Sequence, residues 1–165
     1  MRAWGRLATV LALIWFAPVP LQAQGTGVTL GGLESVRGLP IEIVADDLQV
    51  DNTTGETLFR GNAVLGQGDM RLAAESIRIV FSTGDEQRIR RLEASGGVTL
   101  VTSEEAAEAR DVDYDVDSGT VNMRGSVILT QGPNVLSGDV FRFDLDTGQG
   151  RMEGNVRTII QSGDP

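Results

Sequence analysis

Apolar and polar residues alternate along most of this chain, and the alternation changes parity at regular places. From Ile41 to Ala45 the apolar residues occupy every second position, and the next apolar pair, Leu48 and Val50, falls on the other parity. A period of two is typical of half-buried strands, and a parity shift within extended chain marks a bulge or corner. We therefore predict strands that bend at a small residue, which is Ala45 in this stretch.

The same pattern occurs three more times. The small residue at the parity shift returns as Ala74, Ala109 and Gly138, at intervals of 29, 35 and 29 residues. Turn glycines at positions 55, 84, 119 and 148 keep these intervals, and glycine-led pentapeptides begin at positions 61, 96, 125 and 154. One insertion after Gly84 accounts for the longer interval. A fixed period in this range indicates a stack of units that bury their apolar faces against one another.

Each unit contains three alternating runs and no sustained helical period, so we predict an all-β fold. The expected architecture is an elongated, solenoid-like stack of antiparallel strands in two facing sheets, built from four repeats. Apolar columns then line the inside of a flattened sleeve, either as an ordinary closed core or as a groove for a ligand. The candidate groove residues are Leu48, Val50, Phe59, Ala63, Leu65, Met70, Leu72, Ile77, Ile79, Val98, Leu100, Val112, Tyr114, Met123, Val127, Leu129, Leu136, Phe141 and Phe143.

The ends of the chain differ in composition from the repeats. Residues 1–23 combine two arginines, an apolar stretch and a small residue at position 23, which is typical of a cleaved secretory signal. Residues 24–38 are predicted to form a flexible leader, residues 39–160 the folded domain, and residues 161–165 a disordered tail. Without the signal, 12 basic residues face 23 acidic ones. This balance argues against nucleic acid as a partner.

Candidate chemistry is sparse. The chain contains no cysteine and no histidine, so common nucleophile and base pairs are missing, and we predict neither an enzyme nor a cofactor. Alternate aspartates from Asp111 to Asp117 are expected to line one solvated strand face, because extended spacing keeps them from converging on one calcium ion. No metal site is therefore predicted. The basic cluster Arg88 to Arg91 belongs to the insertion and is expected in a solvated loop, with lipid phosphate or a partner protein as the alternative contact.

An open stack exposes unpaired strand edges, which recruit further strands unless they are blocked. One edge is expected near Pro40 to Ala45 and the other near Val156 to Gln161. We predict head-to-tail addition of strands through these edges. The candidate assembly residues are Ile41, Ile43, Val156, Thr158, Ile159 and Ile160.

The order and spacing of these motifs resemble the periplasmic lipopolysaccharide-export bridge family, the LptA or OstA-like proteins. The resemblance implies a β-jellyroll whose apolar groove holds the acyl chains of lipopolysaccharide. It also implies end-to-end joining with other copies and with jellyroll domains of the inner- and outer-membrane complexes. The motifs that carry it are Ile41-Glu42-Ile43 with Ala45-Asp46, Leu48 and Val50-Asp51; Phe59, Gly61-Asn62-Ala63, Leu65 and Gln67-Gly68; Tyr114; and Gly125, Val127, Leu129, Gln131-Gly132 and Gly138-Asp139.

From the residues and this resemblance we expect an exported, non-enzymatic lipid carrier that passes lipopolysaccharide between membranes. Two other interpretations remain open. One is a structural β-stack that assembles without lipid cargo. The other is the soluble domain of an inner-membrane-anchored relative in the same export system.

Overall fold

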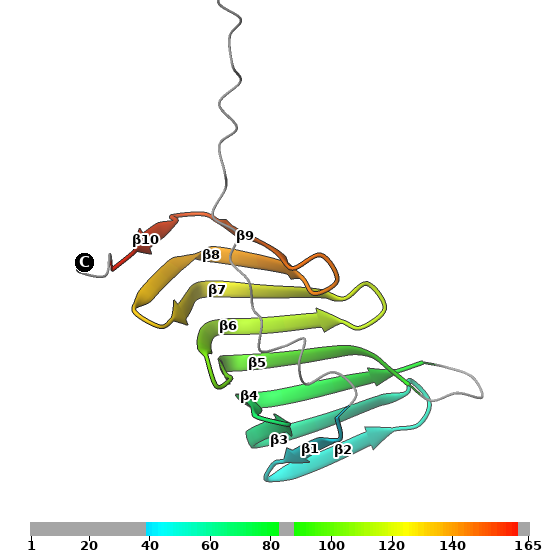
Figure 1. The fold of residues 1–165 in the computed structure, drawn as a ribbon. Helices are drawn as coiled ribbons and strands as arrows, with labels where there is room; N and C mark the ends of the chain where they lie inside the picture. Colours follow the sequence, from blue (N-terminus) through cyan, green and yellow to red (C-terminus); the bar gives the residue numbers. More distant parts are fainter. Residues whose placement is uncertain (1–38, 83–87, 162–165) are drawn as a thin grey trace, which may run out of the picture.

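The structure is a computed structural model that describes residues 39–82 and 88–161 of the chain. Its regular elements are ten β-strands, so the all-β class is confirmed (Figure 1). The predicted signal and leader, and residues 162–165 of the predicted tail, lie outside the described residues. The strands are β1 (Ile41–Val44), β2 (Asp47–Asp51), β3 (Glu56–Gln67), β4 (Met70–Phe81), β5 (Ile89–Val101), β6 (Glu105–Asp115), β7 (Thr120–Gln131), β8 (Asn134–Asp144), β9 (Gln149–Glu153) and β10 (Arg157–Ile159).

All ten strands belong to one antiparallel sheet. Its main path is β1-β3-β4-β5-β6-β7-β8-β10, while β2 pairs with β3 and β9 pairs with β8. β1 and β2 follow each other along one flank of β3, and β10 and β9 do the same along β8. Figure 1 shows these two pairs at opposite ends of an elongated stack.

A line of bulges crosses the sheet at the level of the predicted parity shifts, but the extra residues lie in the strands beside the ones that contain the small residues. In β3, β5 and β7 two consecutive residues stand opposite a single residue of a neighbouring strand. Both residues of each bulge have positive φ, and the same conformation occurs between β9 and β10. The bulge residues are Gly61-Asn62, Gly96-Gly97, Gly125-Ser126 and Gly154-Asn155.

The first bulge position requires glycine for two reasons. At Gly125 the φ angle is 83°, a left-handed conformation that side chains disfavour. A Cβ atom there would also lie 2.7 Å from the Cβ of Arg110 on β6. At Gly61 an added Cβ would meet an Asp46 carboxylate oxygen at 2.5 Å. The glycines therefore allow each strand to bend beneath the side chain of the preceding strand.

The bulges divide the sheet into two limbs, and inward-facing residues of both limbs form one buried cluster. Ala63 and Val127 in one limb, and Ile77 and Phe141 in the other, are 0% exposed. The described residues contain no helix that could cover the sheet, so this burial indicates that the limbs face each other. The first limb contains β1, β10 and residues 63–67, 70–74, 98–101, 105–109, 127–131 and 134–138; the second contains β2, β9 and residues 56–60, 76–81, 89–95, 111–115, 120–124 and 140–144.

The expected architecture needs two refinements. The facing layers are limbs of one continuous sheet, because ladder pairing resumes on both sides of each bulge. The first and second runs of a unit form one bent strand in β4, β6 and β8, whereas in the first unit they stay separate as β1 and β2. Turn glycines 55, 119 and 148 have positive φ, whereas Gly84 lies outside the described residues. The number of repeats stays a prediction from the sequence.

Candidate functional site

Five rows of inward-facing residues run across the strands along the long axis of the stack. The pairing registers align equivalent residues of successive strands, so that Leu65 is opposite Leu72, and Leu129 is opposite Leu136. In the second limb, Phe59 is opposite Ile77 and Met123 is opposite Phe141. At about 4.8 Å per strand, eight strand positions give each row a length of about 34 Å. Apart from the row at the margin of the first limb, which contains Gln67 and Gln131, the interior is thus an apolar surface that continues from one end of the stack to the other.

Most of the predicted groove residues lie in these rows. Thirteen are buried in the core: Ala63, Leu65, Met70, Leu72, Ile77, Ile79, Val98, Val112, Met123, Val127, Leu129, Phe141 and Phe143. Four more are partly buried and pack against it: Phe59, Leu100, Tyr114 and Leu136. The side chains of Phe141 and Phe143 stack with ring centroids 6.1 Å apart.

Leu48 and Val50 depart from the prediction that they are a buried pair. They are 55% and 56% exposed, respectively. The reason is their position on β2, which pairs only with β3 and has no strand on its other side. Both side chains are nevertheless on the inward face of the strand, as predicted, since Leu48 is opposite the inward-facing Phe59 and Val50 is opposite the inward-facing Thr57. They are the uncovered ends of two inner rows.

A cavity of about 350 Å³ opens at this end of the stack. It lies between β1 and β2, where the chain crosses from the first limb to the second. Its lining is mainly apolar and includes Leu48 and Phe59, while Asp46 and Asp47 add two carboxylates. The full lining is Ile43, Val44, Ala45, Asp46, Asp47, Leu48 and Phe59.

Sequence reasoning missed several residues of the inner rows. Leu92 and Val121 are buried, and each lies two residues before another inward-facing residue, which is Ala94 or Met123, respectively. The same parity in the third run could have identified them. Leu145 is also buried, although it follows β8 in a turn. The remaining buried apolar residues outside the predicted set are Ala74, Ala94, Ala107 and Ala109.

Both ends of the stack present unpaired edges, and the predicted assembly residues lie there. Ile41 and Ile43 belong to β1, and Thr158 and Ile159 belong to β10. The sequence analysis missed that each end has two edge strands, because β2 and β9 also pair on one side only. The exposed apolar residues on or beside these strands are Leu39, Ile41, Val44, Leu48 and Val50 at one end, and Val156, Ile159 and Ile160 at the other.

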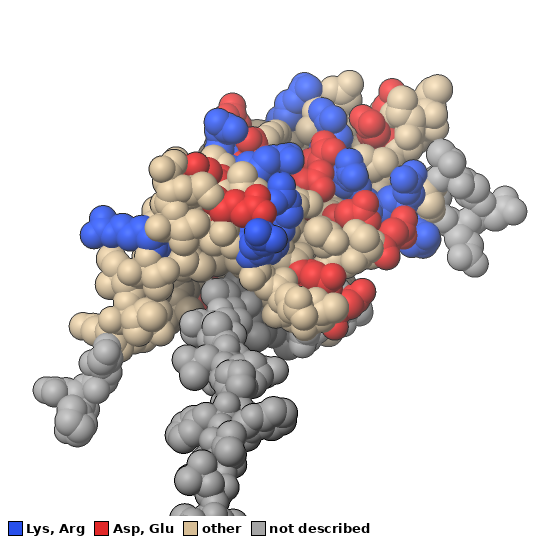
Figure 2. Space-filling view, turned by 90° about the horizontal axis from the view of Figure 1, so that it is seen from above, with Lys and Arg blue, Asp and Glu red and all other residues tan. Residues whose placement is uncertain are grey.

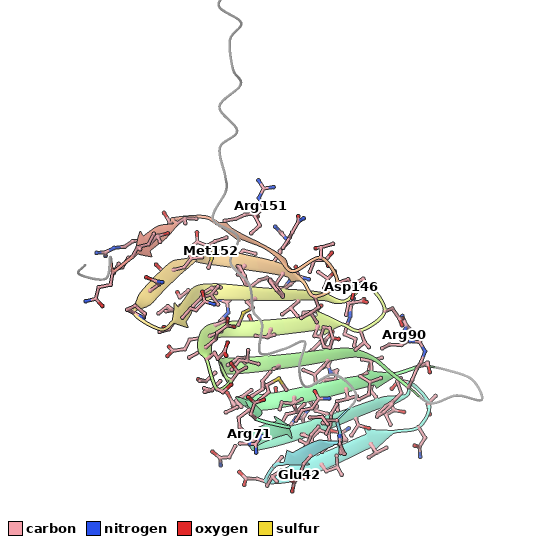
Figure 3. The ribbon with its side chains drawn as sticks, in the orientation of Figure 1. Glu42, Arg71, Arg90, Asp146, Arg151 and Met152 are labelled. Atoms are coloured by element: carbon pink, nitrogen blue, oxygen red, sulfur yellow. The ribbon has the colours of Figure 1, made fainter. Side chains whose placement is uncertain are left out.

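The two ends differ in charge. β1 and β2 carry acidic side chains and no arginine. β9 and β10 contribute Arg151 and Arg157 together with Glu153. Figure 3 shows Glu42 at the first end and Arg151 at the second. Two acidic ends repel each other, so the charges favour contact between unlike ends.

The basic cluster and the acidic run, which were considered separately in the sequence, pair with each other. Arg90 and Arg91 lie on β5, not in the insertion. Arg88 bonds to Asp117, whose other carboxylate oxygen lies 3.8 Å from Arg90 Nε, and an Arg91 nitrogen lies 3.5 Å from an Asp115 oxygen. Such exposed pairs contribute little stability, but they neutralise the arginines. Figure 2 shows acidic and basic side chains interspersed in the same manner.

Three turn aspartates cap backbone N–H groups. Asp51 accepts from Thr53 and Thr54, Asp115 accepts from Ser118, and Asp144 accepts from Asp146 and Thr147. The hydrogen bond from the Thr53 N–H is the largest cause that lowers the pKa of Asp51. The hydrogen bond from the Ser118 N–H does the same for the pKa of Asp115. These carboxylates therefore have structural partners at the hairpin turns.

Residues 39–82 and 88–161 contain no group of three or more potential ligand side chains that could hold a metal ion. In the same ranges, no helix has the length and apolar character needed to cross a membrane.

Comparisons with known proteins agree with this geometry. Residues 42–149 match the family described as LptA/(LptD N-terminal domain) LPS transport protein. An uncharacterised protein of Rhizobium meliloti (strain 1021) is 26% identical over 138 residues, which cover 79% of this chain and 74% of that protein. The crystal structure of LptH from Pseudomonas aeruginosa, described as the LptA-homologous periplasmic component of a lipopolysaccharide transport device, superposes with a TM-score of 0.69. At 17% identity, that match covers 78% of this chain and 99% of LptH, and it supports the jellyroll fold.

Proposed function

The chain belongs to the LptA/(LptD N-terminal domain) family of LPS transport proteins, and from this premise we propose that it is a lipid-binding bridge in the periplasm. In this proposal the inner rows shield the acyl chains of lipopolysaccharide while the molecule passes from the inner to the outer membrane. The observation that carries the proposal is the continuity of the apolar rows across all the strands. As a member of a transport family, the chain is not an enzyme.

The inner rows suit acyl chains energetically. A buried methylene group is stabilised by about 0.8 kcal/mol, so ten methylenes contribute about 8 kcal/mol. Central positions such as Ile77 and Phe141 exclude water completely, so an entering chain must displace side chains that are already packed. Met123 and Met152 are suited to this because methionine is flexible and polarisable. They lie side by side with Phe141 in one row.

Head-to-tail assembly completes the bridge in this proposal. The inner rows end uncovered at both edges, and a second copy can continue them. Five inward residues at the edges are 40–64% exposed: Ile41, Leu48, Val50, Val156 and Ile160. If a second copy covers their side chains completely, the hydrophobic effect contributes about 4–8 kcal/mol to association. Association costs at least about 4 kcal/mol. We therefore expect reversible, concentration-dependent association.

The pairing inside the sheet supplies a register for this contact. Within the chain, β7 pairs with β8 so that Val127 is opposite Gly138 and Met123 is opposite Phe141. Transferring this register to the junction places Met152 opposite Leu48 of the next copy. It also places Thr158 opposite Ile43, and Ile160 opposite Ile41. Jellyroll domains of the inner- and outer-membrane complexes are proposed to use the same edges at the two ends of the bridge.

Calorimetric titration of the purified protein with lipopolysaccharide tests the lipid-binding part. Leu136 is partly buried in an inner row, so Leu136→Ser is expected to weaken binding while the fold is retained. Ile128 lies on the outer face of the neighbouring strand, and Ile128→Ser is the matched control. Equal effects of the two variants would contradict the proposal. Self-association without any lipid binding would favour the structural scaffold.

A further inference from the structure

The two limbs differ at the margin farthest from the bulges. The second limb ends in apolar residues that include Phe81, Ile89 and Leu145. The first limb ends in a row that is mostly polar. Its members are Gln67, Met70, Thr102, Glu105, Gln131 and Asn134, placed in register by the pairs Gln67 with Met70, Glu105 with Gln131, and Gln131 with Asn134, and by the hydrogen bond from the Thr102 N–H to the Glu105 carbonyl.

Glu105 is the charged residue of this row and is only 8% exposed. It shares the inward parity of Ala107 and Ala109 on β6. One of its carboxylate oxygens accepts a hydrogen bond of 2.7 Å from the Gln131 side-chain amide. Its backbone N–H donates to the Thr102 hydroxyl at 3.2 Å. The carboxylate is thus held in a defined orientation on the apolar interior.

A buried carboxylate is costly even when it is hydrogen-bonded, because it loses hydration. The equivalent position of the other units holds Ile41, Met70 and Asn134, none of which is charged. An apolar residue therefore fits this place in the stack. Positions where a sequence departs from the locally favourable residue are expected at functional sites.

We propose that Glu105, oriented by Gln131, is a polar subsite that binds hydrogen-bond donors where an acyl chain joins its polar head. The inference rests on the proposed function, since it needs an acyl chain in the inner rows. A carboxylate has about four acceptor positions and can exchange partners. The ligand groups that it selects are amide N–H and hydroxyl groups. Phosphate is disfavoured, because Glu105 is itself negative and none of the six described members of this row is an arginine or a lysine.

The position of the subsite orients the cargo. The next inward residues from this margin toward the bulges are Ala107 and Leu129, which belong to an apolar row. A chain whose donor group contacts Glu105 can therefore extend its methylenes over that row.

The test compares two ligands that differ in donors but share one acyl chain. N-decanoyl ethanolamine carries an amide N–H and a hydroxyl, whereas methyl decanoate has acceptors only. Binding is measured by calorimetry below the aggregation threshold of each ligand. We expect the wild-type protein to bind the donor ligand about tenfold more tightly, as one hydrogen bond to a charged group allows.

Glu105→Met is expected to abolish this preference and to leave the affinity for methyl decanoate unchanged. It should also raise the unfolding temperature, because methionine occupies the equivalent position 70. Glu105→Gln keeps an acceptor oxygen and should retain part of the preference. Glu104→Gln removes the same charge from the neighbouring exposed residue and is the matched control, with the preference intact.

Four results would overturn the inference. A preference for the donor ligand that survives in Glu105→Met places the subsite elsewhere, and a fall in the unfolding temperature of that variant marks Glu105 as a structural residue. If the wild-type protein binds the two ligands with equal affinity, the subsite is wrong while the proposed lipid function stands. Failure of both ligands to bind the wild type overturns the proposed lipid function, and the subsite with it.

Discussion

The substitution Leu48→Asp tests whether the exposed ends of the inner rows form an assembly interface. Leu48 is 55% exposed on the edge strand β2 and lines the cavity at that end. In the isolated molecule the new carboxylate can remain in water, so stability should change little. In a head-to-tail contact the proposed register places it against Met152 of the next copy, where it has no partner.

The expected loss of association free energy in Leu48→Asp has two parts. In the contact, the part of the Leu48 side chain that is exposed in the monomer becomes buried. Losing this burial removes about 1 kcal/mol of hydrophobic stabilisation. Burying the aspartate adds a penalty whose upper limit is the cost of protonating it, about 4 kcal/mol at pH 7 for a group with a pKa near 3.9. The total lies between about 1 and 5 kcal/mol, which weakens association by about 5-fold to several thousand-fold.

Sedimentation velocity over a concentration series measures this effect. The wild-type protein should increase in average mass with concentration, while Leu48→Asp stays monomeric over the same range. Val101→Asp is the control, because Val101 is 42% exposed but lies on the outer face of the central strand β5. Unchanged association of Leu48→Asp, or equal loss in both variants, would refute this interface.

Three further predictions concern the fold. Ile77→Ala should destabilise the protein by about 2–5 kcal/mol in urea unfolding, because Ile77 is completely buried; a smaller loss would argue that the site is not packed. Gly125→Ala should cost about 1–3 kcal/mol, and clearly more than Gly132→Ala, where a Cβ meets open space; similar melting temperatures would contradict the bulge geometry. The lowered pKa of Asp115 means that its contribution is present above the unfolded value of 3.8 and is lost as pH falls below it. Asp115→Asn should therefore flatten the acid side of the stability curve relative to wild type, and an unchanged slope would count against the Ser118 contact.

Much of the fold was predictable because its signals are local. The parity shift beside Ala74 marks a bulge without knowledge of the partner strand, and Gly61 and Gly125 indicate left-handed backbone. The alternation also identified the inward face of nearly every strand. What alternation cannot give is how the runs connect, so the continuity of β4 through its bend emerged only from the pairing.

For the candidate site, the sequence predicted which side chains face inward but not how exposed they are. Leu48 and Leu72 have the same pattern in the sequence, yet only Leu72 has strands on both sides to cover it. Burial of this kind depends on the neighbours of a strand and is a property of the whole stack. The repeat aligns Glu105 with Ile41 and Met70, but the hydrogen bond of its carboxylate comes from Gln131, 26 positions away in the sequence. Likewise, the pairing of Arg91 with Asp115 follows from register alone.

The most direct test of the central claim is photocrosslinking from adjacent positions of β7 in the presence of lipopolysaccharide. A photoreactive residue at position 129 replaces an inward side chain, and one at position 128 replaces an outward side chain on the same strand. The account predicts crosslinks to lipopolysaccharide from position 129 and none above background from position 128. Equal labelling at the two positions, or labelling from position 128 alone, would contradict a lipid path through the inner rows.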